Sequence, residues 1–148
     1  MEKENIMVRR IECFCESNGY IYKKKSILVE SIATTLIQFS IKKLFTKHYS
    51  IFIMEENDLN KIESFLKVIT NDSQYNREHI MLICATELML NNDEHCAYIG
   101  DNGNNVQIVD CVYYNTISKQ YNYYTDINTP KCFKQLITYL VNNDTDID

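Results

Sequence analysis

The Asn102-Gly103 pair is the strongest local constraint on the fold of this chain. It separates two runs rich in strand-forming residues, 96–100 and 105–114. Asn-Gly readily supplies the positive φ angles that a tight hairpin turn requires. In the second run, Val106, Ile108, Asp110 and Val112 alternate with Gln107, Val109, Cys111 and Tyr113, so a strand would present the two sets on opposite faces. The sequence therefore predicts a β-hairpin with one packed face and one exposed face.

The same turn contains oxygen donors that resemble the start of a calcium-binding loop, at Asp101, Asn102 and Asn104. A calcium loop of that type also needs a distal bidentate Glu and two flanking helices. The sequence has neither feature near this turn. We therefore interpret 101–104 as a type I′ turn.

Helical spacing predicts a long first helix from Ser26 to about Thr46. Leu28, Ile32, Leu36 and Phe39 recur at near-helical intervals, and Ser26 is a suitable N-cap. Lys42, Lys43 and Lys47 near the far end suit the negative pole of a helix dipole. This helix is expected to organise the core.

Further elements follow from apolar periodicity and capping signals. Residues 49–54 predict a buried strand, 77–92 a helix and 118–127 a third strand of the hairpin sheet. Asn57 or Asp58 is expected to cap a helix that reaches about residue 69. Thr129 and Pro130 predict the start of a C-terminal helix. Periodicity does not decide whether residues 6–15 form a strand or a short helix.

The expected fold class is α+β, with a helix-rich N-terminal part followed by an antiparallel three-stranded meander and a closing C-terminal helix. At 148 residues the chain is expected to form one globular domain over 1–148, with an acidic tail frayed from about residue 143. Only 3 Gly and 1 Pro occur, so long flexible linkers are not expected.

Net charge limits the classes of partner. The formal net charge is −5, and the only basic clusters are 23–25 and Lys42, Lys43 and Lys47, so no nucleic-acid partner is expected. No apolar run approaches the ~20 residues that span a bilayer, and the charged N-terminus does not resemble a secretory signal. We expect a cytoplasmic protein without a membrane partner, with its six cysteines reduced. Cys84 and Cys111 are expected to be small core residues.

The sequence contains no recognisable catalytic or cofactor motif. Cys13, Cys15, His95 and Cys96 are potential zinc ligands, but their spacing departs from that of zinc modules. Neither a metal nor a cofactor is expected, and the three glycines form no phosphate-binding loop. The chain is not expected to be an enzyme. One alternative is a small enzyme with a dispersed site, for example Cys111, His95 and Asp110.

A partner-binding surface is the favoured interpretation. Tyrosines and aspartates gather in the C-terminal half, and tyrosine provides a large contact area with a polar tip. The predicted partner-binding residues are Asp101, Asp110, Tyr113, Tyr114, Tyr121, Tyr123, Tyr124 and Asp126. An acidic surface suits a basic protein. The hypothesis is an immunity protein or antitoxin-type inhibitor that occludes the basic active site of a toxin such as a nuclease. The alternative binder is a viral or phage accessory protein that binds a host factor.

Overall fold

The computed structural model describes residues 2–90, 93–101, 103 and 106–143. Its helices and strands follow one another in this order: α1 (Glu2–Ser17), β1 (Tyr22–Val29), β2 (Ile32–Lys42), β3 (Thr46–Glu55), α2 (Leu59–Asn71), the 3-10 turn η1 (Ser73–Tyr75), β4 (Glu78–Thr86), the 3-10 turn η2 (Asp93–His95), β5 (Ala97–Asp101), β6 (Val106–Asn115), β7 (Tyr121–Asn122) and α3 (Lys131–Asn142).

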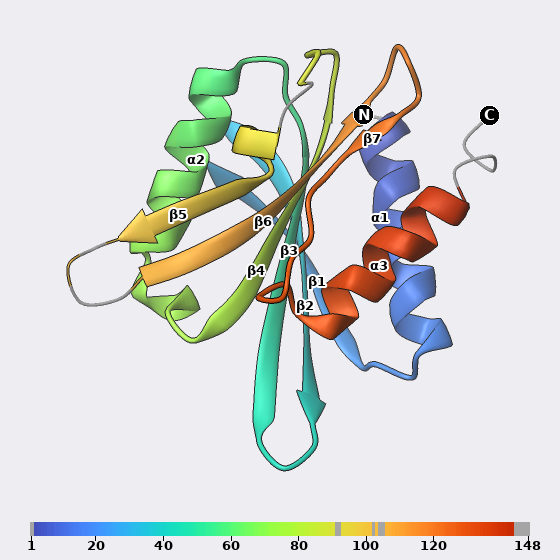
Figure 1. The fold of residues 1–148 in the computed structure, drawn as a ribbon, viewed down its shortest axis with the longest axis vertical. Coiled ribbons are helices and arrows are strands. Elements are labelled where there is room, and N and C mark those ends of the chain that lie inside the picture. The colour runs from blue at the N-terminus through green and yellow to red at the C-terminus, as the bar shows by residue number, and fades with distance from the viewer. Residues whose placement is uncertain (1, 91–92, 102, 104–105, 144–148) are drawn as a thin grey trace.

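The strands form one mixed sheet of seven strands in the order β1-β2-β3-β4-β6-β5, with β7 paired to β6 (Figure 1). β1, β2 and β3 are joined as antiparallel hairpins. β3 runs parallel to β4 because α2 crosses between them, and β4 runs parallel to β6. β5 and β7 are antiparallel to β6. β1 is therefore one edge of the sheet, and β5 and β7 together form the other, along β6.

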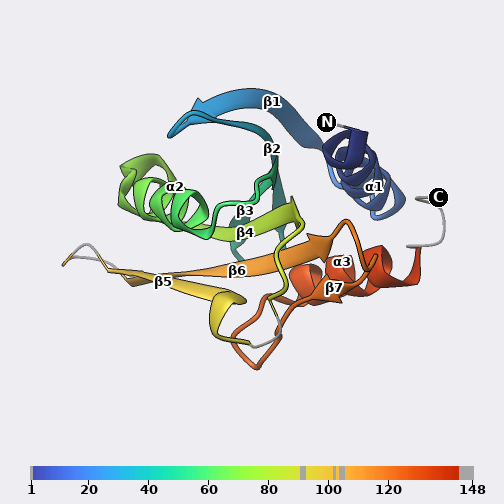
Figure 2. The same ribbon diagram turned by 90° about the horizontal axis from the view of Figure 1, so that it is seen from above.

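Helices cover both faces of the sheet, and two apolar cores result (Figure 2). α2 lies on one face, where Phe65 and Leu66 pack with Phe52 and Leu82 of the central strands. α1 and α3 lie on the other face, where Ile11 and Phe133 pack with residues of β2, β3, β4 and β6. None of the helices in the described ranges is both long and apolar enough to cross a membrane.

Four predicted elements are confirmed. They are the strand at 49–54 within β3, the helix α2, the hairpin of β5 and β6, and the C-terminal helix α3. Asp58 caps α2, because its side chain accepts a hydrogen bond of 2.9 Å from the backbone N–H of Asn60. At α3, however, Pro130 is the N-cap residue and no side chain caps the helix. The turn residues Asn102 and Asn104 and the tail 144–148 lie outside the described residues.

The predicted helix from Ser26 to Thr46 is wrong. This segment forms β1 and β2, which pair in register up to Val29 and Ile32. Glu30 and Ser31 make the two-residue turn between them, with φ angles of 50° and 64°. Type I′ turns usually carry Asn or Gly at these positions, so the sequence lacks the usual signal for a hairpin. The segment is rich in β-branched residues, which favour a strand over a helix.

The predicted helix at 77–92 is also wrong, because residues 78–86 form the central strand β4. Parallel neighbours flank β4 on both edges, and both of its faces are buried. Such a strand has a continuous apolar sequence that periodicity cannot distinguish from a buried helix. The third strand, expected at 118–127, is limited to the two residues Tyr121–Asn122. The class stays α+β, but the predicted helix-rich half and three-stranded meander are replaced by a seven-stranded mixed sheet.

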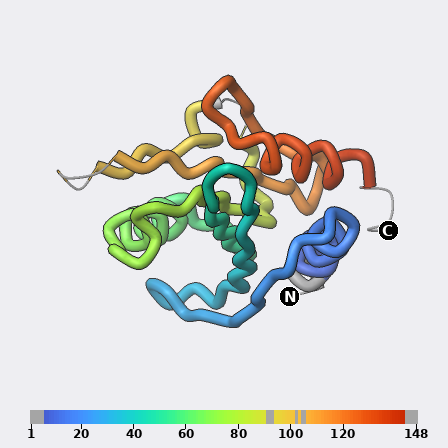
Figure 3. Tube along the Cα trace, turned by 90° about the horizontal axis from the view of Figure 1, so that it is seen from below, coloured from blue at the N-terminus to red at the C-terminus, as the bar shows by residue number. Residues whose placement is uncertain are grey.

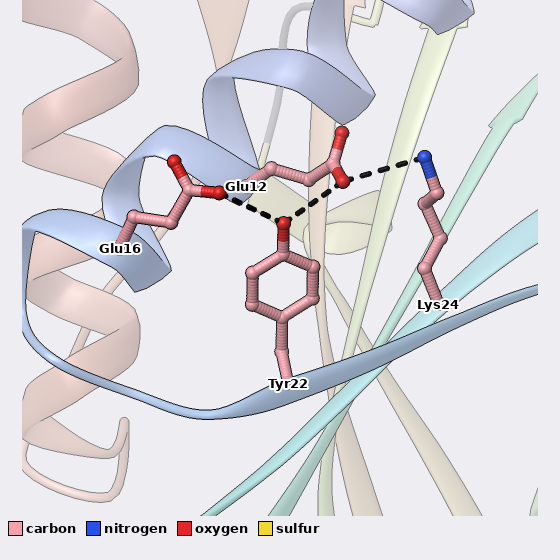
Figure 4. Close-up of polar contacts among 4 residues, drawn as sticks. All are labelled: Glu12, Glu16, Tyr22 and Lys24. Atoms are coloured by element: carbon pink, nitrogen blue, oxygen red, sulfur yellow. Dashed lines mark hydrogen bonds and ion pairs between the residues drawn. The ribbon is translucent and has the colours of Figure 1, made fainter.

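A polar cluster ties α1 to the edge strand β1 (Figure 4). The hydroxyl oxygen of Tyr22 lies 3.0 Å from a carboxylate oxygen of Glu12 and 3.1 Å from one of Glu16. Lys24 forms an ion pair of 3.3 Å with Glu12. Desolvation and the two carboxylates raise the pKa of Tyr22, so the hydroxyl keeps its proton and donates it to one carboxylate at a time. The segment 6–15, which periodicity left open, is thus helical and anchored to the sheet.

Candidate functional site

The hairpin of β5 and β6 has two different faces. Val109, Cys111 and Tyr113 of β6 point into the core beneath α2. Because side chains alternate along a strand, Val106, Ile108 and Asp110 point to the opposite face. Val112 and Tyr114 continue that opposite face, where they join the core beneath α1 and α3. Figure 2 shows α3 alongside the far end of β6 only, which leaves the first half of the strand uncovered on this side.

Strand pairing extends the uncovered surface onto β5. Directly paired residues of antiparallel strands share a face. The pairs are Ala97 with Asp110, Ile99 with Ile108, and Asp101 with Val106. We call these six residues the hairpin face: Ala97, Ile99, Asp101, Val106, Ile108 and Asp110.

The centre of the hairpin face is apolar and open to solvent. Ile99 is 66% exposed, Val106 62% and Ile108 47%. Single exposed apolar residues are common on protein surfaces, but adjacent ones are typical of interaction sites. The α2 side of the same hairpin is rigidly packed, since a Cβ added at Gly100 would lie 2.5 Å from the Cβ of Thr70. The exposed residues therefore lie on a hairpin whose other face is packed against α2.

Carboxylates border this apolar centre. Asp101 is exposed at one end of the face, and Asp110 is buried at the other. The segment after β7 brings exposed Asp126 beside Asp110, and Thr129 links the two. The Thr129 hydroxyl donates to the Asp110 carboxylate and accepts a 3.0 Å hydrogen bond from the backbone N–H of Asp126.

Asp110 and Asp126 line a shallow hollow of about 370 Å³, together with Val106, Ile108 and Tyr124. Burial and, to a smaller extent, the charge of Asp126 raise the pKa of Asp110 to about 6, although the hydrogen bond from Thr129 opposes part of the rise. The described lining of the hollow holds three carboxylates against one Arg, at position 77. A cationic group placed here would favour ionisation of Asp110.

The predicted tyrosine surface is divided between core and solvent. Tyr113 and Tyr114 are buried, on opposite faces of the sheet. Tyr121 is half-buried, and its ring lies 4.9 Å from that of Tyr114. Only Tyr123 and Tyr124 are exposed. In this structure, therefore, Asp101, Asp126 and these last two tyrosines are exposed, Asp110 is buried, and the other three tyrosines contribute to packing.

Sequence reasoning missed the apolar residues of the hairpin face. Ile99, Val106 and Ile108 were counted as strand formers and not as surface residues. Their exposure follows from tertiary structure, because no helix covers this part of β6. The only available signal was the alternation of Val106, Ile108 and Asp110, which places an acid and two apolar side chains on one face.

The residues considered for a dispersed enzyme site do not converge. Asp110 and Cys111 are sequence neighbours on a strand, so their side chains point to opposite faces of the sheet. Burial raises the pKa of the Cys111 thiol. His95 lies at the end of η2, with Nε2 3.3 Å from a carboxylate oxygen of Glu94. A protonated, buried thiol is a poor nucleophile.

The cysteines are mostly core residues. Cys13 is exposed, and Cys15, Cys84, Cys96, Cys111 and Cys132 are buried. Burial raises the pKa of Cys15 and of Cys84 to about 12. Within the described ranges, no group of three or more His, Cys, Asp or Glu side chains is arranged to hold a metal ion.

Comparisons of the chain with protein-family models, with curated proteins and with solved structures found no significant match.

Proposed function

We propose that this protein binds a basic protein partner through the hairpin face and the adjoining segment that carries Tyr124 and Asp126. The observation that supports this best is an exposed apolar strip, Ile99, Val106 and Ile108, with carboxylates at both ends. Protein interfaces commonly combine an apolar centre with a polar rim. Carboxylates at the rim select a partner with Lys or Arg side chains at matching positions.

Association would proceed in two stages. The net charge of −5 and the exposed carboxylates steer a basic partner towards this face. Burial of Ile99, Val106 and Ile108 then supplies apolar contact area, at about 25 cal/mol per Å² before the costs of association. A partner cation in the hollow would offset the mutual repulsion of Asp110 and Asp126.

In its specific form the proposal is an inhibitor of the immunity type. Such a protein blocks the basic active site of a toxin, for example the phosphate-binding residues of a nuclease, by placing carboxylates where the substrate would bind. The support is the acidic charge together with a compact acidic and apolar face. The rival binder, an accessory protein acting on a host factor, uses the same face and differs in the partner.

The test is affinity capture with the tagged full chain, followed by a salt wash and mass spectrometry. The decisive comparison is between variants. Ile108→Arg and Asp126→Lys are expected to abolish retention of the partner. The matched controls Ile21→Arg and Glu63→Lys, at exposed positions outside the hairpin face, are expected to retain it.

Two outcomes would contradict the proposal: no protein retained by the parent chain, or equal retention by Ile108→Arg and Ile21→Arg. A basic toxin that is retained and loses activity on binding would establish the inhibitor form. A retained host regulatory protein would assign the chain to the accessory class instead.

A further inference from the structure

A second, larger hollow adjoins the first and lies between the residues that follow α1, the β2–β3 turn and the start of α3. Its volume is about 740 Å³. The floor is formed by Ile41, Lys47, Tyr49 and His79 of three adjacent strands. Figure 3 views the β2–β3 hairpin end-on, with α2 on one side of it and α1 and α3 on the other. We call this hollow the lysine groove.

The lysine groove is electropositive although the chain as a whole is acidic. Lys43, Lys47 and Lys131 line it, and none of its described lining residues is Asp or Glu. Within the described part of the chain, no carboxylate forms an ion pair with any of these lysines. The positive end of the α3 dipole adds to the field, because no side chain caps this helix.

The floor of the groove contributes no negative charge at neutral pH. Burial and then Lys47 lower the pKa of His79, so its imidazole is neutral. Burial raises the pKa of Cys132 to about 11, although the Tyr49 hydroxyl and Lys47 oppose that rise. The groove therefore offers ammonium groups, a neutral imidazole and a phenol, all of which can donate hydrogen bonds to an anion.

One wall of the groove is apolar and unusually exposed. Leu44 is 89% exposed and Phe45 75% exposed at the tip of the β2–β3 turn, and Ile127 faces them from the segment before α3. Tyr20 completes the lining beside Phe39, on which its ring stacks at 4.9 Å. Exposed aromatic and aliphatic side chains next to cations suit a ligand that has a flat apolar part and an anionic part.

We propose that the lysine groove binds a nucleoside di- or triphosphate, with the phosphates at Lys47 and Lys131 and the base against Phe45. Three ammonium groups in one hollow exceed what a single carboxylate needs, and match the several charges of a polyphosphate. The volume is within the range of sites that hold small organic ligands. The hairpin face contributes no residue to the groove, although His79, Asn128, Thr129 and Pro130 line both hollows. The two proposals are tested separately, because the variants at Lys47 and Lys131 differ from those at Ile108 and Asp126.

The experiment is calorimetric titration of the full chain with ATP, GTP, CTP and UTP, and with adenosine and inorganic triphosphate as partial ligands. At least one nucleotide is expected to bind, with adenosine and triphosphate each weaker by about tenfold or more. Lys47→Gln and Lys131→Gln are each expected to lower nucleotide affinity about tenfold, the loss of one charge-assisted contact. Phe45→Ala is expected to weaken nucleotide and leave triphosphate unchanged.

Lys25→Gln is the matched control, since Lys25 is an exposed lysine of β1 outside the groove. It is expected to change affinity by less than about twofold, because its charge is screened from the groove by distance and salt. The proposal is overturned if no nucleotide binds at millimolar concentration, or if Lys25→Gln weakens binding as much as Lys47→Gln. Equal affinity for triphosphate and nucleotide would also overturn it, as would binding to anionic phospholipid vesicles that nucleotides do not compete with.

Discussion

The carboxylates of Asp110 and Asp126 line one hollow, and the negative charge of Asp126 disfavours ionisation of Asp110. Asp110 is the more buried of the two, and loss of hydration adds to this charge in disfavouring the ionised form of Asp110. The stability of the chain should therefore depend on pH through this residue.

Asp110→Asn is expected to raise the free energy of unfolding at pH 8 by about 1–2 kcal/mol and to change it little at pH 4. The pKa of Asp110 is about 6 in the folded chain and is higher there than in the unfolded chain. The folded state thus binds the proton more tightly. This stabilisation is complete below the unfolded pKa of 3.8, still largely present at pH 4, and lost as the pH rises through 6. Urea titrations at the two pH values measure the difference.

Asp101→Asn is the control for that prediction, because Asp101 is exposed. A gain from Asp110→Asn that is the same at pH 4 and pH 8 would show that charge is not its cause. In a separate NMR titration, Asp126→Asn should lower the pKa of Asp110, since it removes the neighbouring charge.

Substitution of the C-terminal tyrosines by Ala should lower the free energy of unfolding by very different amounts. Tyr114→Ala is expected to cost about 3–5 kcal/mol, because the ring is fully buried and its removal leaves a cavity. Tyr121→Ala should cost less, since that ring is half-buried. Tyr123→Ala is expected to lie within about 0.5 kcal/mol of the parent. Urea unfolding measures all three, and equal effects at Tyr114 and Tyr123 would contradict the burial described above.

Gly100 is expected to be intolerant of a side chain. A Cβ there would lie 2.5 Å from both Cβ and Oγ1 of Thr70 on α2, so Gly100→Ala forces the helix and β5 apart. We expect a loss of about 1–3 kcal/mol from overpacking. Hydrogen exchange in the Gly100→Ala variant, compared with the parent chain, should be accelerated more in β5 and α2 than in β1. A chain that accepts Ala at this position without loss would indicate a looser contact between helix and hairpin.

The turn at Glu30 and Ser31 is a site for stabilisation. Both residues have positive φ, which side-chain-bearing residues other than Asn and Asp rarely adopt. Replacement by Asn-Gly is expected to raise the free energy of unfolding by about 1 kcal/mol. Thermal unfolding of the double variant checks this. A lower melting temperature would mean that the Glu30 or Ser31 side chain makes a contribution that outweighs the strain.

Local signals predicted those elements whose boundaries carry specific residues. Asp58 marked the start of α2, Pro130 that of α3, and Asn102-Gly103 the turn between β5 and β6. The elements that were predicted wrongly lack such markers, or their conformation is determined by the neighbouring strands. The β1–β2 turn uses Glu and Ser in place of Asn and Gly, and β4 is a strand because two parallel strands enclose it.

The candidate site was predictable only in part, for a related reason. The aspartates were identified from charge, and the sequence placed Asp110 on the face with Val106 and Ile108. Whether that face is covered depends on how much of β6 lies beneath α3. No local sequence pattern determines this. The same packing buries Tyr113 and Tyr114, and so removes them from the surface where the hypothesis had placed them.

The pairing of the first and last helices has a consequence for the order of assembly. α1 and α3 share one core, and Nη1 of Arg10 lies 3.5 Å from the backbone oxygen of Leu140, 130 residues away in sequence. Contacts between such distant segments form late and slow the folding of a domain. While the chain is being synthesised, α1 and the sheet face beneath it must wait for residues 131–142, with Ile11 and Tyr114 lacking their final neighbours. A nascent chain at that stage presents apolar surface to chaperones, and a stop codon placed before α3 should yield an aggregating product.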